Sequence, residues 1–224
     1  MLTSQPDVST PTLAEAALAT EPADKPLIRV PRPARARKNR RVDILQTLAK
    51  LLEDPQCDRI TTALIAKKLD LSEAALYRSF PSKAAMYDAL IEFVEKSLMD
   101  LCTRIRADQN LKCVARIQVM TTVMLDFADA NRGLTRVMTG QVLLKEDPRL
   151  TERMNHLVDK LEMSLRQTFR DAVLARELPA DFDASARANL LINWILGRWL
   201  RFVMTGFLVR PNGVSPVALA PFVS

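Results

Sequence analysis

The stretch that decides the fold is TTALIAKKLDLSEAALYRSFPSK, residues Thr61–Lys83. Its pattern predicts two short helices around a tight turn, followed by the start of a third helix. The turn falls at 70–72, where Ser72 can cap the next helix because its hydroxyl accepts from an unpaired backbone N–H. The expected apolar stripe of the first helix comprises Ala63, Ile65, Ala66 and Leu69.

The helix after this turn has two distinct faces. Leu76 and Phe80 stand four residues apart, so both are predicted to face inward. The residues left for the outer face are Ser72, Glu73, Ala74, Tyr77 and Arg78. A helix-turn-helix needs this division, because one face packs while the other enters the major groove of DNA. The stretch therefore predicts a protein that reads DNA.

Basic charge is concentrated just ahead of this stretch. The 224 residues include 32 lysines and arginines against 26 acidic residues, a formal net charge of +6. Seven basic residues and no acidic ones lie between Arg29 and Arg41. A basic segment in this position suggests a polyanion as partner, and we expect Lys38, Arg40 and Arg41 to contact the DNA backbone. The alternative is a solvated tail without a specific partner.

We expect an all-α fold in three parts. Residues 1–36 hold six of the thirteen prolines and predict a disordered leader that ends in the basic arm. Residues 37–83 predict a three-helix DNA-binding domain, whose core includes Leu45, Leu48, Ile65, Leu69, Leu76 and Phe80. Residues 84–224 predict a helical domain for dimerisation and partner binding.

Periodicity places the individual helices. The expected ranges are 38–53 for the first helix, then 82–106 with Ser82 as cap, 112–130, 134–144, 148–176 and 183–207. Gly133 is expected to act as the C-terminal cap of the helix at 112–130, and the tail from Pro211 to be irregular. The helix at 183–207 is apolar nearly all round, so we expect it to pack against its own domain and a partner subunit.

The sequence gives no support for a catalytic site, a metal site or a disulfide framework. Three cysteines at wide spacing form neither a disulfide framework nor a zinc pattern. There is no nucleophile–base pair, no phosphate-cradling glycine loop and no acidic metal cluster. We therefore expect a protein that is not an enzyme and needs no cofactor or metal. No secretory signal or membrane span is visible, which indicates a cytoplasmic location.

The run LSEAALYRSFPSK, residues 71–83, followed by a long helix and an all-α body, resembles the TetR family of DNA-binding regulators. Other runs look like the members of that family that act in nucleoid occlusion: KNRRVDILQTLA (38–49), residues 59–98, GLTRVMTGQVLL (133–144) and RFV…F…RP (201–211). The resemblance implies a TetR-like fold and a homodimer that binds palindromic double-stranded DNA and associates with the nucleoid. It also implies binding to the tubulin-like division GTPase FtsZ, so that FtsZ ring assembly is inhibited over the chromosome.

The resemblance implies two DNA-contacting residues, and the chemistry of neighbouring side chains suggests others. Tyr77 and Lys83 correspond to the family's backbone-contacting residues, a hydroxyl donor and a lysine at a helix N-terminus. Thr61 and Thr62 could cap a helix and contact phosphate together. Ser72, Glu73 and Ala74 lie where the helix faces the groove, and a glutamate can accept from cytosine N4. The alternatives are a partly buried core tyrosine and threonines that only cap.

For the partner surface, the resemblance implies a groove between the helices at 83–106 and 112–130. Phe93 and Leu134 stand at matching positions, and plain core packing is the alternative for both. Basic residues expected in this groove are replaced here by Leu101 and Ala130. Arg104 and Arg132 lie nearby in the sequence.

Two other function classes stay open. The first is a TetR-type transcriptional repressor that releases DNA when a small ligand enters the body, which needs an apolar cavity with a few polar groups. Side chains that could line either a cavity or a core are Met120, Met124, Phe127 and Trp194. The second is a structural interaction protein, which the basic arm and the helix-turn-helix together argue against.

Overall fold

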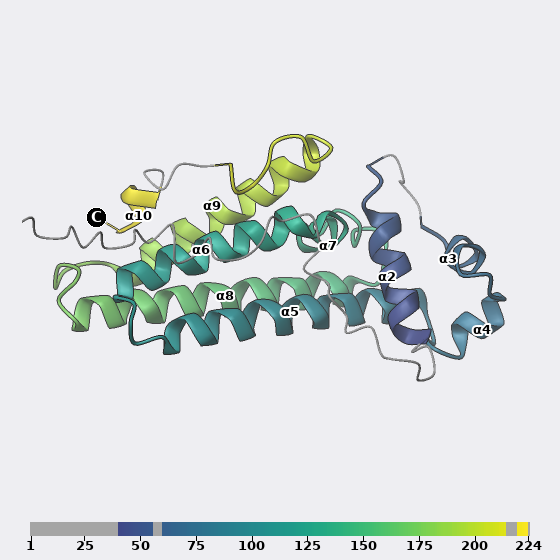
Figure 1. Ribbon diagram of the computed structural model, residues 1–224, viewed down its shortest axis with the longest axis horizontal. Helices are drawn as coiled ribbons and strands as arrows, with labels where there is room; N and C mark the ends of the chain where they lie inside the picture. Colours follow the sequence, from purple (N-terminus) through teal and green to yellow (C-terminus); the bar gives the residue numbers. More distant parts are fainter. Residues whose placement is uncertain (1–39, 56–59, 214–218, 224) are drawn as a thin grey trace, which may run out of the picture.

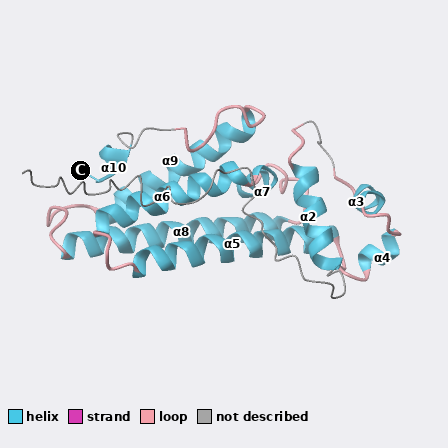
Figure 2. Cartoon of the chain, in the orientation of Figure 1, coloured by secondary structure: helices cyan, strands magenta, loops and turns pink. Residues whose placement is uncertain are grey.

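The computed structural model describes residues 40–55, 60–213 and 219–223. All regular structure within these ranges is helical, which confirms the expected all-α class (Figure 2). Three helices form a head at one end of an elongated helical body (Figure 1). The expected leader and arm at 1–36 lie outside the described residues, as does Lys38.

The head consists of α2 (Arg40–Leu52), α3 (Thr62–Lys68) and α4 (Glu73–Tyr77). Four of the six expected core residues, Leu48, Ile65, Leu76 and Phe80, are fully buried. Leu45 and Leu69 are only half-buried. Ala63, which was expected in the apolar stripe, is exposed. The reason is helical geometry: two residues turn an α-helix by about 200°, so Ala63 lies on the face opposite Ile65.

The body consists of α5 (Lys83–Ala107), α6 (Cys113–Ala130), α7 (Arg132–Met138), α8 (Pro148–Leu174), α9 (Ala184–Met204) and the short α10 (Ala220–Val223). Helices α5, α6 and α8 run alongside one another, and α9 packs on α6 and α8 (Figure 1). The indole N–H of the buried Trp199 donates to the Met124 carbonyl (3.2 Å) and so ties α9 to α6. None of the described helices combines the length and apolar character needed to cross a bilayer.

Two expected helices are shorter in the structure. The helix expected at 134–144 is α7, which ends at Met138 because Gly140 takes the left-handed φ of +74° and turns follow. Helix α9 ends at Met204 rather than at Phe207, since Gly206 and Phe207 both have positive φ. The tail that was expected to be irregular contains α10.

Gly133 does not cap α6, contrary to the expectation from sequence. Asn131 ends α6, and Gly133 lies inside α7 against α2. A Cβ added at Gly133 would lie only 2.0 Å from the carbonyl oxygen of Ala49. Glycine is therefore required at position 133 by this close approach rather than by backbone conformation.

A second contact joins the same two helices one turn further along α7. Nη1 of Arg136 donates to the carbonyls of Leu52 (3.3 Å) and Asp54 (2.8 Å), which satisfies acceptors at the end of α2.

We expect Gly133→Ala to lower the free energy of unfolding by at least about 2 kcal/mol, because the methyl group forces α7 away from α2. Urea unfolding followed by circular dichroism measures the change. Gly213→Ala is the matched control, since the nearest atom to its Cβ would be 3.5 Å away. Equal stability of the two variants would contradict the close contact.

Candidate nucleic-acid interface

The turn between α3 and α4 is built by backbone hydrogen bonds. The N–H of Leu71 donates to the Ala66 carbonyl (2.9 Å), and the N–H of Asp70 donates to the Lys67 carbonyl (3.3 Å). This pair of bonds is the Schellman pattern that closes a helix C-terminus. Asp70 supplies the left-handed residue, with φ of +54°, a conformation that aspartate tolerates better than most residues. The turn thereby sets the direction in which α4 leaves α3.

A side-chain hydroxyl caps the N-terminus of each of the helices α3, α4 and α5. Thr61 Oγ1 accepts from the N–H of Leu64 (3.2 Å), so Thr61 rather than Thr62 caps α3. Ser72 Oγ accepts from Ala75 N–H (3.2 Å). Ser82 Oγ accepts from Ala85 N–H (3.1 Å). The caps predicted at Ser72 and Ser82 are confirmed.

The outer face of α4 has the exposure that the sequence predicts. Its residues, Ser72, Glu73, Ala74, Tyr77 and Arg78, are all exposed, with Tyr77 at 46%. On the other face, Leu76 and Phe80 are fully buried. In Figure 1, α3 and α4 lie at the tip of the head, away from the body. The face is therefore open to a partner, while its contacts with DNA stay predictions.

Three of the predicted site residues form one hydrogen-bonded chain across the two helices. The Tyr77 hydroxyl donates to Thr62 Oγ1 (3.4 Å), and the Thr62 hydroxyl donates to Glu73 Oε2 (2.7 Å). Nothing in the sequence indicates that these three side chains meet. The structure brings a predicted phosphate contact and a predicted base contact together through Thr62.

Lys83 has a partner that the sequence did not indicate. It is the first residue of α5, and its ammonium forms an ion pair with Glu146 just before α8. Only 23% of the Lys83 side chain and 17% of the Glu146 side chain are exposed. The same ammonium lies 5.7 Å from the centre of the Tyr87 ring. Lys83 therefore links the start of α5 to the segment just before α8.

Arg41 is also used inside the head. Its Nη1 donates to the Ser79 carbonyl (2.7 Å), and its guanidinium lies 4.1 Å above the Phe80 ring. These contacts tie the start of α2 to the end of α4. Arg40 is exposed at the first position of α2. Thr61 is exposed as well as capping.

Phe93 and Leu134 share an apolar pocket of about 110 Å³. The other lining residues are Val42, Leu45, Gln46, Ala49 and Leu90. The pocket thus lies between α5, α2 and α7, and not between α5 and α6 as the sequence analysis expected. Phe93 is half-buried and Leu134 is buried. The half-buried Leu101 and Ala130 do not line it.

Both parts of the chain are similar to known families. Residues 44–90 match the family model described as bacterial regulatory proteins, tetR family. Residues 111–216 match the model described as tetracyclin repressor-like, C-terminal domain.

Full-length relatives are similar over most of the chain. The chain is 43% identical over 175 residues to the nucleoid occlusion factor SlmA of Vibrio cholerae, which covers 78% of this chain and 89% of the relative. It is 43% identical over 177 residues to the SlmA of Sodalis glossinidius, covering 79% and 89%. It is 41% identical over 175 residues to that of Aliivibrio fischeri, covering 78% and 89%.

Solved structures share the fold. A TetR transcription regulator from Haloarcula marismortui superposes with a TM-score of 0.68 at 17% identity, covering 82% of this chain and 95% of that chain. FadR from Bacillus subtilis, solved in complex with stearoyl-CoA, gives a TM-score of 0.66 at 14% identity, covering 82% and 97%. At these identities the likeness supports the fold alone.

Tyr77→Phe is expected to weaken binding to all DNA sequences by the same factor, about fivefold, because it removes the one hydroxyl proton that Tyr77 can turn from Thr62 to a phosphate. Lys83→Ala should act likewise and flatten the dependence of affinity on salt, which we expect to be steep. Fluorescence anisotropy of an operator and a scrambled duplex, titrated across salt concentrations, measures both quantities.

The matched control is Lys96→Ala, which removes an exposed lysine in the middle of α5. Its affinity and salt slope should equal those of the wild type. A change of sequence preference at constant overall affinity would contradict the backbone role of Tyr77 and Lys83.

Proposed function

Because the chain belongs to the SlmA group of nucleoid occlusion factors within the TetR family of DNA-binding regulators, we propose that it binds palindromic DNA as a homodimer and inhibits FtsZ ring assembly over the chromosome. Its relatives are regulators and not enzymes, in agreement with the sequence analysis. The observation that carries the DNA-binding half is the exposed outer face of α4, held in place by caps and core. The division half is supported by the relatives and by the apolar pocket at Phe93.

The reading face indicates how affinity and selectivity are divided. Ser72, Glu73 and Ala74 offer only a hydroxyl, one carboxylate and a methyl group to base edges. Contacts to phosphate must therefore supply much of the affinity, and Arg40 and Tyr77 are exposed on the head for this role. Such a protein binds many related sites along a chromosome, as nucleoid occlusion requires.

A seam on α9 supports the homodimer. Exposed positions alternate at spacings of three and four residues: Leu190, Asn193, Gly197, Leu200 and Met204. The leucines and the methionine are 59%, 40% and 71% exposed. This spacing is that of a helix seam that packs on a second helix, and large exposed apolar patches mark interaction surfaces. Among the described residues, and apart from the backbone of its own helix and its chain neighbours, no atom lies within 4 Å of the position of a Cβ on Gly197, so a second helix can approach closely there.

Leu200→Glu should reduce dimer association at least about 100-fold, because a two-fold interface would bury two unpaired carboxylates. Sedimentation equilibrium measures the association constant. Leu174→Glu is the control, since Leu174 is 81% exposed and lies at the end of α8 rather than on the α9 seam. If the Leu200 variant associated as strongly as the wild type, the α9 seam would be ruled out as the dimer surface.

The Phe93 pocket is the proposed docking site for an apolar segment of FtsZ. Its walls come from the head through α2 and from the body through α5 and α7. Arg132, which is exposed at the start of α7, does not line this pocket, and its guanidinium lies 5.9 Å from the centre of the Phe207 ring. A pocket with walls from both parts depends on how the head is set on the body, which supports a partner that senses the DNA-bound form.

Phe93→Ala is expected to abolish co-sedimentation with FtsZ polymers while it leaves DNA affinity within twofold. Loss of the ring removes the largest apolar contact that the pocket offers to a partner. The control is Phe182→Ala, which truncates another half-buried phenylalanine, in the α8–α9 loop at the far end of the body (Figure 1). Absence of co-sedimentation by the wild type, with and without specific DNA, would refute the FtsZ half of the proposal.

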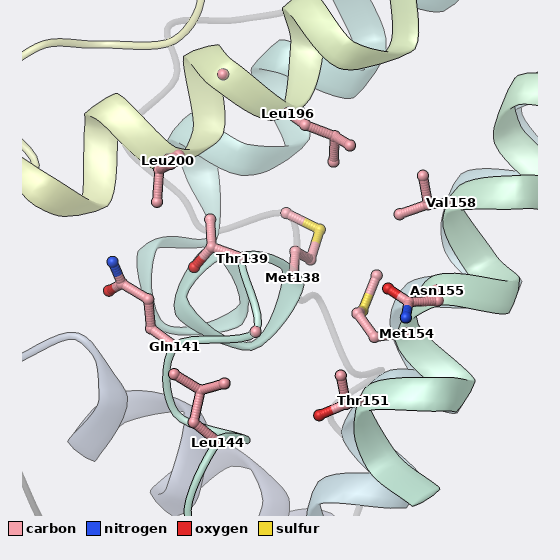
Figure 3. A pocket seen from close by; sticks show the side chains of 12 residues that line it. Met138, Thr139, Gln141, Leu144, Thr151, Met154, Asn155, Val158, Leu196 and Leu200 are labelled. Carbon is pink, nitrogen blue, oxygen red and sulfur yellow. The ribbon is translucent and has the colours of Figure 1, made fainter. Parts of the chain in front are cut away.

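A second pocket favours the alternative of a ligand-responsive repressor. It has a volume of about 380 Å³ and opens between the segment after α7, α8 and α9 (Figure 3). Apolar side chains such as Met138, Met154 and Leu196 line it together with the polar Gln141 and Asn155, a composition typical of small-molecule sites.

The side chains first considered for such a cavity lie elsewhere. Met120, Met124 and Phe127 are buried in the core, and Trp194 packs on Phe222 with ring centres 5.6 Å apart. Genome-wide mapping of bound sites separates the two functions. Many scattered palindromes that are missing near the replication terminus favour nucleoid occlusion, whereas one site upstream of a transporter favours a repressor.

A further inference from the structure

We propose that Thr62 is a positioning residue for base selection: it anchors Glu73, so that the start of α4 selects cytosine in the major groove. The inference rests on the proposed DNA-reading function. It departs from the expectation that Thr62 contacts phosphate or caps a helix.

The hydroxyl of Thr62 is not required for capping. Thr61 accepts from the Leu64 N–H and completes the cap of α3, while Thr62 occupies the first helical position. The Thr62 hydroxyl instead crosses to α4, where it donates to Glu73 Oε2 at 2.7 Å. Tyr77 donates to the Thr62 oxygen from the next turn of α4, at 3.4 Å.

The bond has little to contribute to folding. An exposed side-chain hydrogen bond adds only about 0.5–1.5 kcal/mol to stability. The two helices are already set by the turn at Asp70 and by the cap at Ser72. What the bond fixes is the direction of Glu73, whose long side chain otherwise samples several rotamers that binding would have to freeze.

A fixed carboxylate can discriminate bases by both attraction and repulsion. With Oε2 engaged by Thr62, Oε1 is the atom available to a base edge. Cytosine presents only the N4 amine, a donor, whereas guanine and thymine present acceptor oxygens that a carboxylate repels. Adenine also presents an amine at N6, but its acceptor N7 lies beside that amine and repels the carboxylate. An unanchored glutamate would swing away from the phosphates and from an unfavourable base, and the penalty for the wrong base would shrink. Anchoring therefore matters more for selectivity than for affinity.

The test compares Thr62→Val, which keeps the shape and loses the hydroxyl, with Thr62→Ser, which keeps the hydroxyl. An operator is first selected from random duplexes with the wild-type protein. Affinities for every single-base variant of that operator are then measured at one salt concentration, and the salt slope is measured separately. Melting temperatures confirm that the variants fold.

We expect Thr62→Val to reduce discrimination between bases by about fivefold at one base pair in each half-site of the operator. The dependence of affinity on salt should stay unchanged. Thr62→Ser should keep the wild-type profile. In a Glu73→Ala background, Thr62→Val should cause no further loss of discrimination, because both changes remove the same interaction. Tyr77→Phe keeps the Thr62–Glu73 bond and should leave base preference intact.

Two results would overturn the proposal alone. One is an unchanged base preference of Thr62→Val, and the other is an equal loss of affinity for all sequences with a shallower salt slope, which indicates a phosphate contact. A wild-type protein without any sequence preference would overturn the proposed DNA-reading function as well.

Discussion

The close contact between α7 and α2 is the constraint on which the rest of the structure depends. Gly133 lets the backbone of α7 approach the Ala49 carbonyl, and Arg136 binds the carbonyls of Leu52 and Asp54 at the end of α2. Helix α2 carries the head, so this junction determines how the head sits on the body. The same junction forms two walls of the pocket that contains Phe93. The proposed DNA-reading face and the proposed partner surface therefore both depend on this one short contact.

A second connection runs through the start of α5. Lys83 follows the Ser82 cap directly and pairs with Glu146, which belongs to the segment between α7 and α8. That segment also supplies Gln141 and Leu144 to the larger pocket of the body. The predicted phosphate-binding end of α5 is therefore in electrostatic contact with the part of the body nearest that pocket. Because both side chains are mostly buried, salt screens the attraction between them only weakly.

The sequence by itself determined the features that depend on neighbours within a few positions. The helix-turn-helix, the caps at Ser72 and Ser82, the turn at Asp70 and the two faces of α4 are all of this kind. Each follows from propensity, capping or helical period, which short stretches of chain carry. Family membership followed from the same stretch, residues 71–83, and from longer similar runs.

Only the tertiary structure decided the features that join distant parts of the chain. The local sequence pattern predicted that Gly133 caps a helix, whereas in the fold Gly133 lies inside α7 in close contact with α2. Glu177, beyond α8, accepts from the N–H groups of Cys113 and Val114 (both 2.9 Å) and so caps α6; burial opposes its ionisation, but these donors hold its pKa below the usual value. The pairing of Lys83 with Glu146 is of the same type. Such partners lie more than 60 residues apart, and no local period records which side chains the fold will bring together.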